Sequence, residues 1–481
     1  MELNKLLNGI EVVEVIGDST VEIKDLKCDS NAVSEGSLFF CLTGRVSDGN
    51  KYIKQAKSYG AVAIVTGKKS NVNVTQVIVK NARQAMAKMA SQFFDNPDKK
   101  LKIIGVVGTN GKTTTANMTY SVLNSAGFKA GVIGTLGVKF CGREYPPTLT
   151  TPDPIDLYRI LGEMADCGVE YAVMEVSAHA IYLDKVKDLN FYAGVFTNFS
   201  QDHLDFFGDM KTYKQAKLKF FKENQMKYAV INSDDEVGRE ITTFLPKAIT
   251  YGVDNPSDVF ALEIKCNSDN STFVINLFDC IYRVKINMVG RFNVLNALAV
   301  SSVSALAGVE TDAVIDGIKQ FNGIEGRLEK IVDKGTTVYI DYAHTPDGLE
   351  KVLSTLKPLC TGKLISVFGC GGNRDSDKRR KMGAISGKIA DFTVITTDNP
   401  RYEEPMEIIA EIEKGVLKHT KNYVLVENRK DGIEYAVNYA KSGDVILIAG
   451  KGGEKYQEIL GIKHLYNDKD TVEELLRGKE N

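Results

Sequence analysis

Several features that mark common protein classes are missing from this sequence. No apolar run approaches the roughly 20 residues of a membrane-spanning helix, and the start MELNKLLNGIEVV has no apolar core behind a basic stretch. We therefore expect neither a membrane span nor a signal peptide. The eight cysteines are scattered and form no CxxC pair. This argues against a zinc site or a disulfide framework and is typical of reduced thiols in a cytoplasmic protein.

An excess of charge is missing as well. The 481 residues include 60 basic and 62 acidic side chains, which gives a net charge of -2. We therefore expect no nucleic-acid partner and no attraction to an anionic membrane. The chain has no internal repeat and no low-complexity tract, and its length exceeds that of one ordinary domain.

The apolar runs predict an α/β protein of three domains. Residues 1–98 mix short strands such as SLFFCL and AVAIV with a helix, and DNPDKK ends them. Residues 99–327 alternate unbroken apolar strands with helices, as in a doubly wound parallel sheet, and carry an antiparallel patch between about residues 258 and 289. Residues 328–481 form a second, Rossmann-like α/β unit. Its strands run directly into GCGGNRD, DNPR and GKGGE, and ligands bind at such strand ends.

A glycine-rich loop links the strand LKIIGVVG to the following helix. It reads Gly108-Thr109-Asn110-Gly111-Lys112-Thr113-Thr114, and Val106 stands where a longer phosphate loop has its first glycine. In such a loop the backbone amides approach phosphate groups, the lysine reaches the outer phosphates and the hydroxyl after it ligates Mg²⁺. The strand–loop–helix context favours a nucleotide site over a glycine turn with an exposed lysine.

Three further residues are candidates because of their predicted positions. Glu175 ends the strand YAVME and His203 follows the strand AGVFTN. Both could hold Mg²⁺ near the loop, although imidazole is an unusual ligand for so hard an ion, and each residue alone is more often structural. Lys217 lies on a helix with a buried aromatic face, and its residue type alone favours a solvated lysine.

A series of motifs runs along residues 28–454 in the order GTNGKTTT, MEVSAHA, TNFSQDHLDFFGD, YKQAK, GRFNVLNALA, EGRLE, DYAHTPD, GCGGNRD and DNPR. On these motifs the chain resembles the Mur ligase family, whose phosphate loop has the same shortened form. The resemblance implies an enzyme with ATP and Mg²⁺ that phosphorylates a carboxylate and then joins an amine to it. It also implies a cytoplasmic protein of peptidoglycan synthesis that acts on UDP-N-acetylmuramoyl-L-alanyl-D-glutamate, and we expect a monomer.

The resemblance assigns roles to single residues. Catalysis is implied for Lys112, His203 and Lys217, of which the last matches a lysine that CO₂ converts to a carbamate. Metal binding is implied for Thr113, Glu175, His203 and this carbamate. ATP contacts are implied for the loop from Gly108 to Thr114 and for Asn293, Arg327, Asp341 and His344. The structural alternatives are helix capping for Asn293 and a surface ion pair for Arg327. Because Arg327 lies at a predicted domain boundary, it could reach phosphate when the domains close.

Two substrate sites are also implied. The uridine nucleotide with its dipeptide is expected between the first two domains, near the loop from Gly44 to Ser47 and at Ser30, Thr150, Thr151, Ser177 and Lys185. The added amino acid is expected at Arg374, Asp398, Asn399, Pro400, Arg401, Gly450 and Glu454. DNPR is the family form associated with meso-diaminopimelate. The Arg401 guanidinium suits its distal carboxylate and repels the ammonium of lysine, and Glu454 could pair with the distal ammonium.

Two positions depart from the family pattern, and three alternatives stay open. Lys185 stands where arginine is usual, which removes a two-point contact, and Gly453 replaces a histidine, which predicts a looser loop before Glu454. The alternatives are a lysine-adding member of the family, a folylpolyglutamate synthase and a non-catalytic ATP-binding scaffold. Arg401 argues against the lysine-adding enzyme. DNPR and the match of the first domain argue against the folylpolyglutamate synthase. The scaffold would need a broken catalytic set, but the chain has Lys112, Thr113, Glu175, His203 and Lys217.

Overall fold

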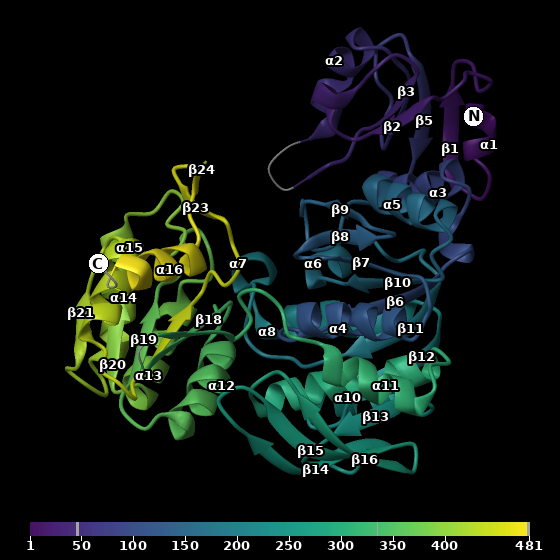
Figure 1. The fold of residues 1–481 in the computed structure, drawn as a ribbon. Coiled ribbons are helices and arrows are strands. Elements are labelled where there is room, and N and C mark those ends of the chain that lie inside the picture. Colours follow the sequence, from purple (N-terminus) through teal and green to yellow (C-terminus); the bar gives the residue numbers. More distant parts are fainter. Residues whose placement is uncertain (45–47, 334, 479–481) are drawn as a thin grey trace. The chain divides into compact units, whose positions relative to one another are not determined.

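The computed structural model describes residues 1–44, 48–333 and 335–478, and Figure 1 labels its helices and strands. The chain is an α/β protein, as the sequence predicts. It divides into two compact units: unit 1 is Met1–Val107, Gly127–Val195 and Ala216–Ala229, and unit 2 is Gly108–Ala126, Phe196–Gln215 and Val230–Asn481. Because the chain passes repeatedly between the units, the ranges 1–98, 99–327 and 328–481 stay a prediction.

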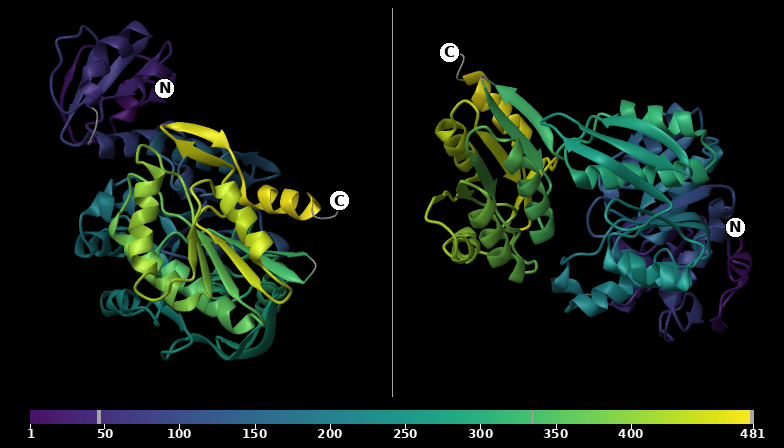
Figure 2. Two further views of the ribbon diagram at one scale, coloured as in Figure 1. Left: turned by 90° about the vertical axis from the view of Figure 1, so that its left-hand side faces the viewer. Right: turned by 90° about the horizontal axis from the view of Figure 1, so that it is seen from below.

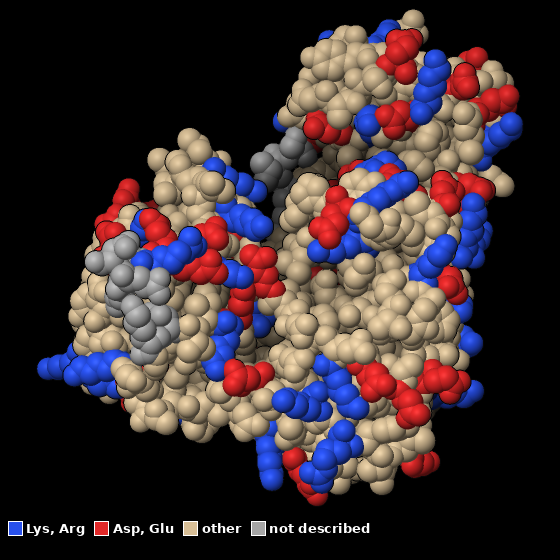
Figure 3. Space-filling view, in the orientation of Figure 1, with Lys and Arg blue, Asp and Glu red and all other residues tan. Residues whose placement is uncertain are grey.

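Within the described ranges, no helix combines the length and the apolar character needed to cross a membrane. On the face drawn in Figure 3, basic and acidic side chains are interspersed, in keeping with a net charge of -2.

The first part of unit 1 is a five-stranded sheet in the order β1-β5-β4-β3-β2. β1 runs antiparallel to β5, and the other neighbours are parallel. Helix α2 covers the sheet through Ile53 and Ala56, which pack with Phe39 and Ile64. The elements are α1 (Leu3–Leu6), β1 (Val12–Ile16), β2 (Asp25–Lys27), β3 (Ser37–Phe40), α2 (Ile53–Ser58), β4 (Ala61–Thr66), β5 (Thr75–Val79) and α3 (Ala82–Phe93).

The second part of unit 1 is a run of strands in the order β11-β6-β10-β7-β8-β9. β6, β10 and β7 are parallel and, apart from Lys102 at the start of β6, buried along their length, as their apolar sequences predict. The antiparallel ribbon β8–β9, which the sequence analysis missed, extends this edge. The elements are β6 (Lys102–Val107), β7 (Ala130–Gly134), β8 (Gly137–Phe140), β9 (Arg143–Tyr145), α5 (Pro154–Asp166), β10 (Tyr171–Glu175), α6 (Ala178–Tyr182), β11 (Phe191–Phe196) and α8 (Met210–Glu223).

Unit 2 contains the helix that follows the phosphate loop and the predicted antiparallel patch. Its strands have the order β16-β15-β14-β13-β12, with β14, β15 and β16 antiparallel as expected. Helix α4 packs on α10 and α11. The elements are α4 (Lys112–Ser125), α7 (Leu204–Phe207), β12 (Met226–Asn232), α9 (Glu236–Phe244), β13 (Ile249–Gly252), β14 (Val259–Cys266), β15 (Ser271–Leu277), β16 (Cys280–Ile286), α10 (Arg291–Leu306) and α11 (Thr311–Gln320).

The rest of unit 2 is a six-stranded sheet in the order β17-β18-β22-β19-β20-β21, parallel except for β17. Helices α12, α13 and α14 pack on one face and α15 and α16 on the other, as the left view of Figure 2 shows. The elements are β17 (Glu329–Asp333), β18 (Thr336–Asp341), α12 (Pro346–Leu356), β19 (Leu364–Phe368), α13 (Asp377–Ile389), β20 (Phe392–Ile395), α14 (Pro405–Val416), β21 (Tyr423–Leu425), α15 (Arg429–Tyr439), β22 (Val445–Ala449), β23 (Tyr456–Ile459), β24 (Ile462–Leu465) and α16 (Asp468–Gly478).

Candidate functional site

The phosphate loop of unit 2 is built around two glycines that admit no side chain. A Cβ on Gly108 would lie 1.8 Å from Thr197 Oγ1, and one on Gly111 would lie 2.6 Å from Asn296 Oδ1. Gly111 also has a φ of 84°, a left-handed conformation that favours glycine, and it is the N-cap of α4. Gly111 provides no side-chain cap for α4, and such a helix N-terminus favours an anion such as phosphate.

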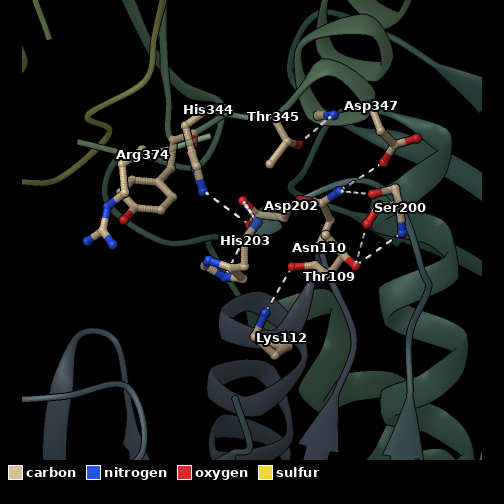
Figure 4. A network of polar contacts seen from close by, with 12 residues as sticks. Thr109, Asn110, Lys112, Ser200, Asp202, His203, His344, Thr345, Asp347 and Arg374 are labelled. Atoms are coloured by element: carbon tan, nitrogen blue, oxygen red, sulfur yellow. Dashed lines mark hydrogen bonds and ion pairs between the residues drawn. The ribbon is translucent and has the colours of Figure 1, made fainter. Parts of the chain in front are cut away.

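Lys112 and Asn110 give the loop its shape. Lys112 Nζ donates hydrogen bonds to the carbonyl oxygens of Gly108 at 3.0 Å and Thr109 at 2.9 Å, so the ammonium lies over the loop. Asn110 Nδ2 donates to Ser200 Oγ at 3.3 Å and to Asp347 Oδ2, at the start of α12, at 2.8 Å. Figure 4 shows these side chains around the loop. The loop is thereby tied to the C-terminal part of unit 2.

His203 and His344 meet at a carboxylate that the sequence analysis passed over. Asp202 is buried, and its Oδ2 lies 3.3 Å from His203 Nε2 and 3.7 Å from His344 Nε2 (Figure 4). Burial alone would raise the pKa of Asp202, but His344 and His203 lower it well below its ordinary value. Two expected ATP or metal residues therefore share one anionic partner. The sequence did offer one indication of Asp202, because this residue stands directly before His203 in the same polar segment.

Arg327 and Asp341 organise the segment that leads into β18. Arg327 Nη2 donates to Thr113 Oγ1 at 3.3 Å, and its guanidinium lies over the Tyr342 ring at 4.3 Å. Asp341 accepts hydrogen bonds from the backbone N–H groups of Leu328 at 2.8 Å and Ala343 at 2.7 Å. The surface ion pair considered for Arg327 is therefore wrong, since its side chain turns toward the phosphate loop.

Asn293 lies inside α10, whose N-cap is Gly290, so the capping alternative is also wrong. Its Nδ2 donates to the carbonyl of Val289 at 2.9 Å, and its Oδ1 accepts from Asn296 Nδ2 at 3.1 Å. Asn296 in turn faces Gly111 and accepts from Thr115 Oγ1 at 3.4 Å. Buried amides thus connect α10 to the loop.

Unit 1 brings together Glu175 and most of the residues expected for the uridine-nucleotide substrate. Glu175 accepts from Thr135 N at 2.8 Å and from Thr135 Oγ1 at 3.2 Å. Thr135 Oγ1 lies 3.1 Å from Thr150 Oγ1, and Thr151 Oγ1 donates to the carbonyl of Glu175 at 2.8 Å. Thr151 also accepts from Ser177 N at 2.9 Å. The end of β10 and the segment before α5 therefore form one polar cluster.

The remaining expected residues of unit 1 lie apart from this hydrogen-bonded chain. Lys185 Nζ lies 2.8 Å from Asp153 Oδ1, so its charge is already paired. Ser30 Oγ donates to Gln55 Oε1 at 3.2 Å in the first sheet. Of the expected loop from Gly44 to Ser47, residues 45–47 lie outside the described residues.

Lys217 is buried in α8, with 1% of its surface exposed. The solvated interpretation is therefore wrong. Tyr213, Phe220 and Phe221 are buried on the same helix, and their spacing of four, three and four residues from Lys217 puts all four on one face. That spacing was the signal for a buried lysine, which must be paired or chemically altered because an isolated buried charge is costly.

The residues expected to bind the amino acid follow parallel strands of the C-terminal sheet. β18, β22, β19 and β20 are neighbours in this order, and their carboxyl ends lead into the segments 342–345, 450–454, 369–375 and 398–401. Parallel strands place their carboxyl ends at one edge of the sheet, where ligands bind in open α/β folds. Arg374, half exposed, lies 3.5 Å from Asp205 through Nη1 and Oδ2.

The DNPR segment and the segment 450–454 are joined by buried polar groups. Fully buried Lys451 donates from Nζ to Asn399 Oδ1 and to Glu454 Oε2, both at 2.9 Å, and Asn399 Nδ2 donates to the same oxygen of Glu454 at 3.0 Å. Burial alone would raise the pKa of Asp398, but the charges of Lys451 and Arg429 bring it below its ordinary value. The sequence analysis missed Lys451, whose ammonium links Asn399 of one segment to Glu454 of the other.

Mg²⁺ is a hard cation and is held by oxygen ligands. In the described part of the chain, no three His, Cys, Asp or Glu side chains gather into a group that could hold a metal. Mg²⁺ often takes only one or two oxygens from a protein and completes its shell with phosphate oxygens and water. The Thr113 hydroxyl and the Glu175 carboxylate are such donors.

Comparison with known proteins agrees with this arrangement. Three family models match: "Mur ligase family, catalytic domain" at residues 22–95, "Mur ligase middle domain" at 106–304 and "Mur ligase, glutamate ligase domain" at 326–452. A UDP-N-acetylmuramoyl-L-alanyl-D-glutamate--2,6-diaminopimelate ligase 1 of Clostridium acetobutylicum is 43% identical, with 99% of each chain covered. The ligase of this type from Clostridioides difficile is 40% identical over 99% of each chain. A solved structure of such a ligase has a TM-score of 0.71 at 29% identity, covering 100% of this chain and 99% of the other.

Proposed function

This chain belongs to the Mur ligase family, and we propose that it adds meso-diaminopimelate to the D-glutamate carboxylate of UDP-N-acetylmuramoyl-L-alanyl-D-glutamate at the expense of ATP. The product is a peptidoglycan precursor. The choice of amino acid rests on the position of Arg401, which follows β20 at the carboxyl end of the C-terminal sheet. Relatives that match over nearly the full chain, named for the same reaction, support it. In the proposal the enzyme is a cytoplasmic monomer without a nucleic-acid or membrane partner.

The chemistry requires activation of an acid. A carboxylate is a poor electrophile, so the γ-phosphoryl group of ATP first passes to the D-glutamate carboxylate oxygen, giving an acyl phosphate and ADP. The amine of diaminopimelate then attacks the acyl carbon, loses a proton and expels phosphate. Phosphoryl transfer depends on positioning and charge neutralisation more than on covalent help from the protein.

The groups that would neutralise this charge come from unit 2. Lys112, the amides from Gly108 to Thr114 and Arg327 would hold the phosphates, and Asn293, Asp341 and His344 would complete the ATP site. The Arg327–Thr113 contact supports the proposal that the arginine approaches the phosphates. Asp341 and Asp202 would act by holding Arg327's segment and the two histidines in place.

Mg²⁺ would be held by Thr113 and Glu175, and a second ion by His203 with Lys217 as a carbamate. When bound, the metal withdraws charge from the phosphate oxygens and orients them. The buried position of Lys217 supports this role, since carbamylation converts a costly buried cation into an anion that can face a metal.

The two organic substrates would bind at polar clusters already in place. The dipeptide would contact Thr150, Thr151, Ser177 and Lys185, and the uridine nucleotide Ser30. Diaminopimelate would lie at the strand ends that carry Arg374, Asp398 to Arg401, Gly450 and Glu454. The guanidinium of Arg401 would take the distal carboxylate, which lysine lacks.

The test is a product analysis. The purified protein is incubated with ATP, Mg²⁺, the uridine-nucleotide dipeptide and meso-diaminopimelate, and the product is identified by mass spectrometry while ADP and phosphate are counted. We expect one amide bond for each ATP consumed and no phosphate release when any one substrate is omitted. ATP binding without ADP formation under any of these mixtures would instead indicate a non-catalytic scaffold.

A further inference from the structure

Two cysteines of unit 1 that lie 26 positions apart in the sequence are in contact. The Sγ atom of Cys141 lies 3.6 Å from the carbonyl oxygen of Cys167, which accepts a weak hydrogen bond from the thiol. All eight cysteines are free thiols, and among residues 1–44, 48–333 and 335–478 no other hydrogen bond joins two of them. Cys141 is exposed and Cys167 is partly exposed, so a small oxidant in solution reaches the pair.

Cys141 occupies a turn whose backbone does not favour cysteine. Residues 141 and 142 connect β8 to β9, whose ends pair through Phe140 and Arg143. Both turn residues have positive φ, 47° at Cys141 and 74° at Gly142, as in the two-residue turns that favour Asn-Gly. A cysteine adopts this left-handed conformation at a cost that asparagine or glycine largely avoids. The backbone of the turn therefore does not explain the cysteine, whereas the contact of its sulfur gives the side chain a role.

The β8–β9 ribbon is held against the end of α5, which keeps the two cysteines together. Tyr145, in β9, donates from its hydroxyl to Glu163 Oε2, in the last turns of α5, at 2.7 Å. Cys167 is the C-cap of this helix. The Cys141 sulfur thus already touches the residue to which it would bond. A rotation of the Cys167 side chain with a small shift of the exposed turn would give the usual Cβ separation of about 4 Å.

The chain between the two cysteines contains residues expected to bind the dipeptide. It comprises β9, the segment 146–153 and α5, and Thr150 and Thr151 lie in that segment. α5 is anchored by its buried face, whereas residues 146–149 are exposed. A covalent bond between the ribbon and the end of α5 would therefore restrict the part of this stretch that packing leaves free.

We propose that Cys141 and Cys167 are an oxidation site, at which hydrogen peroxide converts two thiols into one reversible disulfide. This inference goes beyond the ligase reaction and does not depend on it. Disulfides of proteins in reducing compartments are usually transient, and a pair of neighbouring accessible cysteines suits such a bond.

The reaction has two steps. The Cys141 thiolate attacks one peroxide oxygen, the O–O bond breaks, and Cys141 becomes a sulfenic acid while the other oxygen leaves as water. The Cys167 thiolate then attacks the Cys141 sulfur, the S–O bond breaks, and the departing hydroxide takes up a proton. The two thiols lose two electrons and two protons in total, and one peroxide is reduced to two molecules of water. A dithiol reductant restores both thiols by exchange.

The test maps the bond in the folded, full-length protein. The wild type is treated with hydrogen peroxide, the remaining thiols are blocked with N-ethylmaleimide, and tryptic peptides are analysed by mass spectrometry before and after dithiothreitol. We expect peptides 140–143 and 160–185 to be linked before reduction and separate after it. Cys141→Ser and Cys167→Ser should each abolish the linked peptide. Cys280→Ser, which removes an exposed cysteine of β16, is the matched control and should retain it.

The bond should also change the stability of the protein. Because it closes a loop of 26 positions and so lowers the entropy of the unfolded chain, the oxidised wild type should melt several degrees above the reduced form. Hydrogen exchange of the backbone amides from Thr148 to Thr151 should become slower, and dithiothreitol should reverse both changes. Peroxide should raise neither quantity in Cys141→Ser.

Three results would overturn the inference. They are linkage of Cys141 to a cysteine other than Cys167, oxidation of both residues to sulfinic acid without a linked peptide, and a linked peptide that forms only when peroxide is added in urea. The last result would mean that the contact in the folded protein does not direct the bond. None of these outcomes bears on the ligase reaction, which is measured separately with the reduced protein.

Discussion

Arg429 and Asp468 form a two-point ion pair from which solvent is excluded. Nε and Nη2 of Arg429 donate to the two carboxylate oxygens of Asp468, each at 2.8 Å, and neither side chain is exposed. Arg429 Nη2 also donates to the carbonyl of Ala449 at 3.0 Å, next to the segment 450–454. These residues begin α15 and α16, so the pair anchors both helices at the end of the sheet where the amino acid is proposed to bind.

Replacement of Arg429 tests this anchor. Arg429→Met leaves Asp468 buried without a counter-charge, and we expect the free energy of unfolding of the C-terminal part to fall by about 3–5 kcal/mol. The double variant Arg429→Met, Asp468→Leu should recover part of the loss, because it removes the stranded charge. Denaturant unfolding followed by circular dichroism measures both effects.

The neighbouring residue supplies the control for that experiment. Lys430 and Glu474 also join α15 to α16, at 2.9 Å, but both are largely exposed. Exposed pairs contribute little because water and salt screen them, so Lys430→Met should leave the unfolding transition almost unchanged. Equal destabilisation by the two single variants would contradict the account.

Acid unfolding should report on Asp398. Although burial alone would raise the pKa of Asp398, Lys451 and Arg429 hold it below the ordinary value of 3.8. The stability from this charge is complete above pH 3.8 and is lost as the pH falls through the lowered pKa. We therefore expect the wild type to lose stability more steeply below about pH 4 than Asp398→Asn does. Urea unfolding at pH 5, 4 and 3 measures the two slopes, and parallel slopes would exclude this role for Asp398.

Lys217 tests the proposed carbamate. Lys217→Ala should lose most of the ligase activity, and added bicarbonate should not restore it because the variant has no amine to modify. Lys219→Ala is the control on the same helix, since Lys219 is partly exposed and pairs with Asp184 at 2.6 Å. Full activity of Lys217→Ala would remove the carbamate from the mechanism. Melting curves of both variants show whether lost activity reflects lost folding.

The sequence predicted the sheets well where apolar residues decide the structure. Strands such as β6 and β10 have unbroken apolar sequences because both faces are covered, and the alternation near residues 258–289 indicated the antiparallel patch. The ribbon β8–β9 was missed because strands of four and three residues carry too few positions for a pattern. The burial of Lys217 was readable in principle from the spacing of Tyr213, Phe220 and Phe221, but residue type outweighed it.

The partners of the candidate residues were less predictable. Arg401 was found from DNPR, but its ion pair with Glu458 joins residues separated by 57 positions, and the register of the β23–β24 hairpin on the DNPR segment decides it. Asp202 and Lys451 were missed for a related reason. Both are buried, Asp202 near His344 and Lys451 beside Asn399, and these contacts join residues far apart in the sequence. Local sequence gives the strand ends, whereas tertiary packing selects the contacts made there.

Arg401 itself is tested through the Michaelis constants. Arg401→Ala should raise KM for meso-diaminopimelate tenfold or more, because a charged two-point contact is lost, and should leave KM for ATP within about twofold. Arg401→Lys should recover part of the affinity, since it keeps the charge but not the fork. An equal rise in both Michaelis constants would mean that Arg401 supports the structure of unit 2 rather than the amino acid.

The most direct test of the central claim is a comparison of two amino acids in the wild type. Phosphate release is measured with ATP, Mg²⁺ and UDP-N-acetylmuramoyl-L-alanyl-D-glutamate, with either meso-diaminopimelate or L-lysine as the varied substrate. The account predicts that kcat/KM for meso-diaminopimelate exceeds that for L-lysine by at least about a hundredfold, because a site built for a charged group rejects an analogue without it. Equal or greater kcat/KM with L-lysine would contradict it.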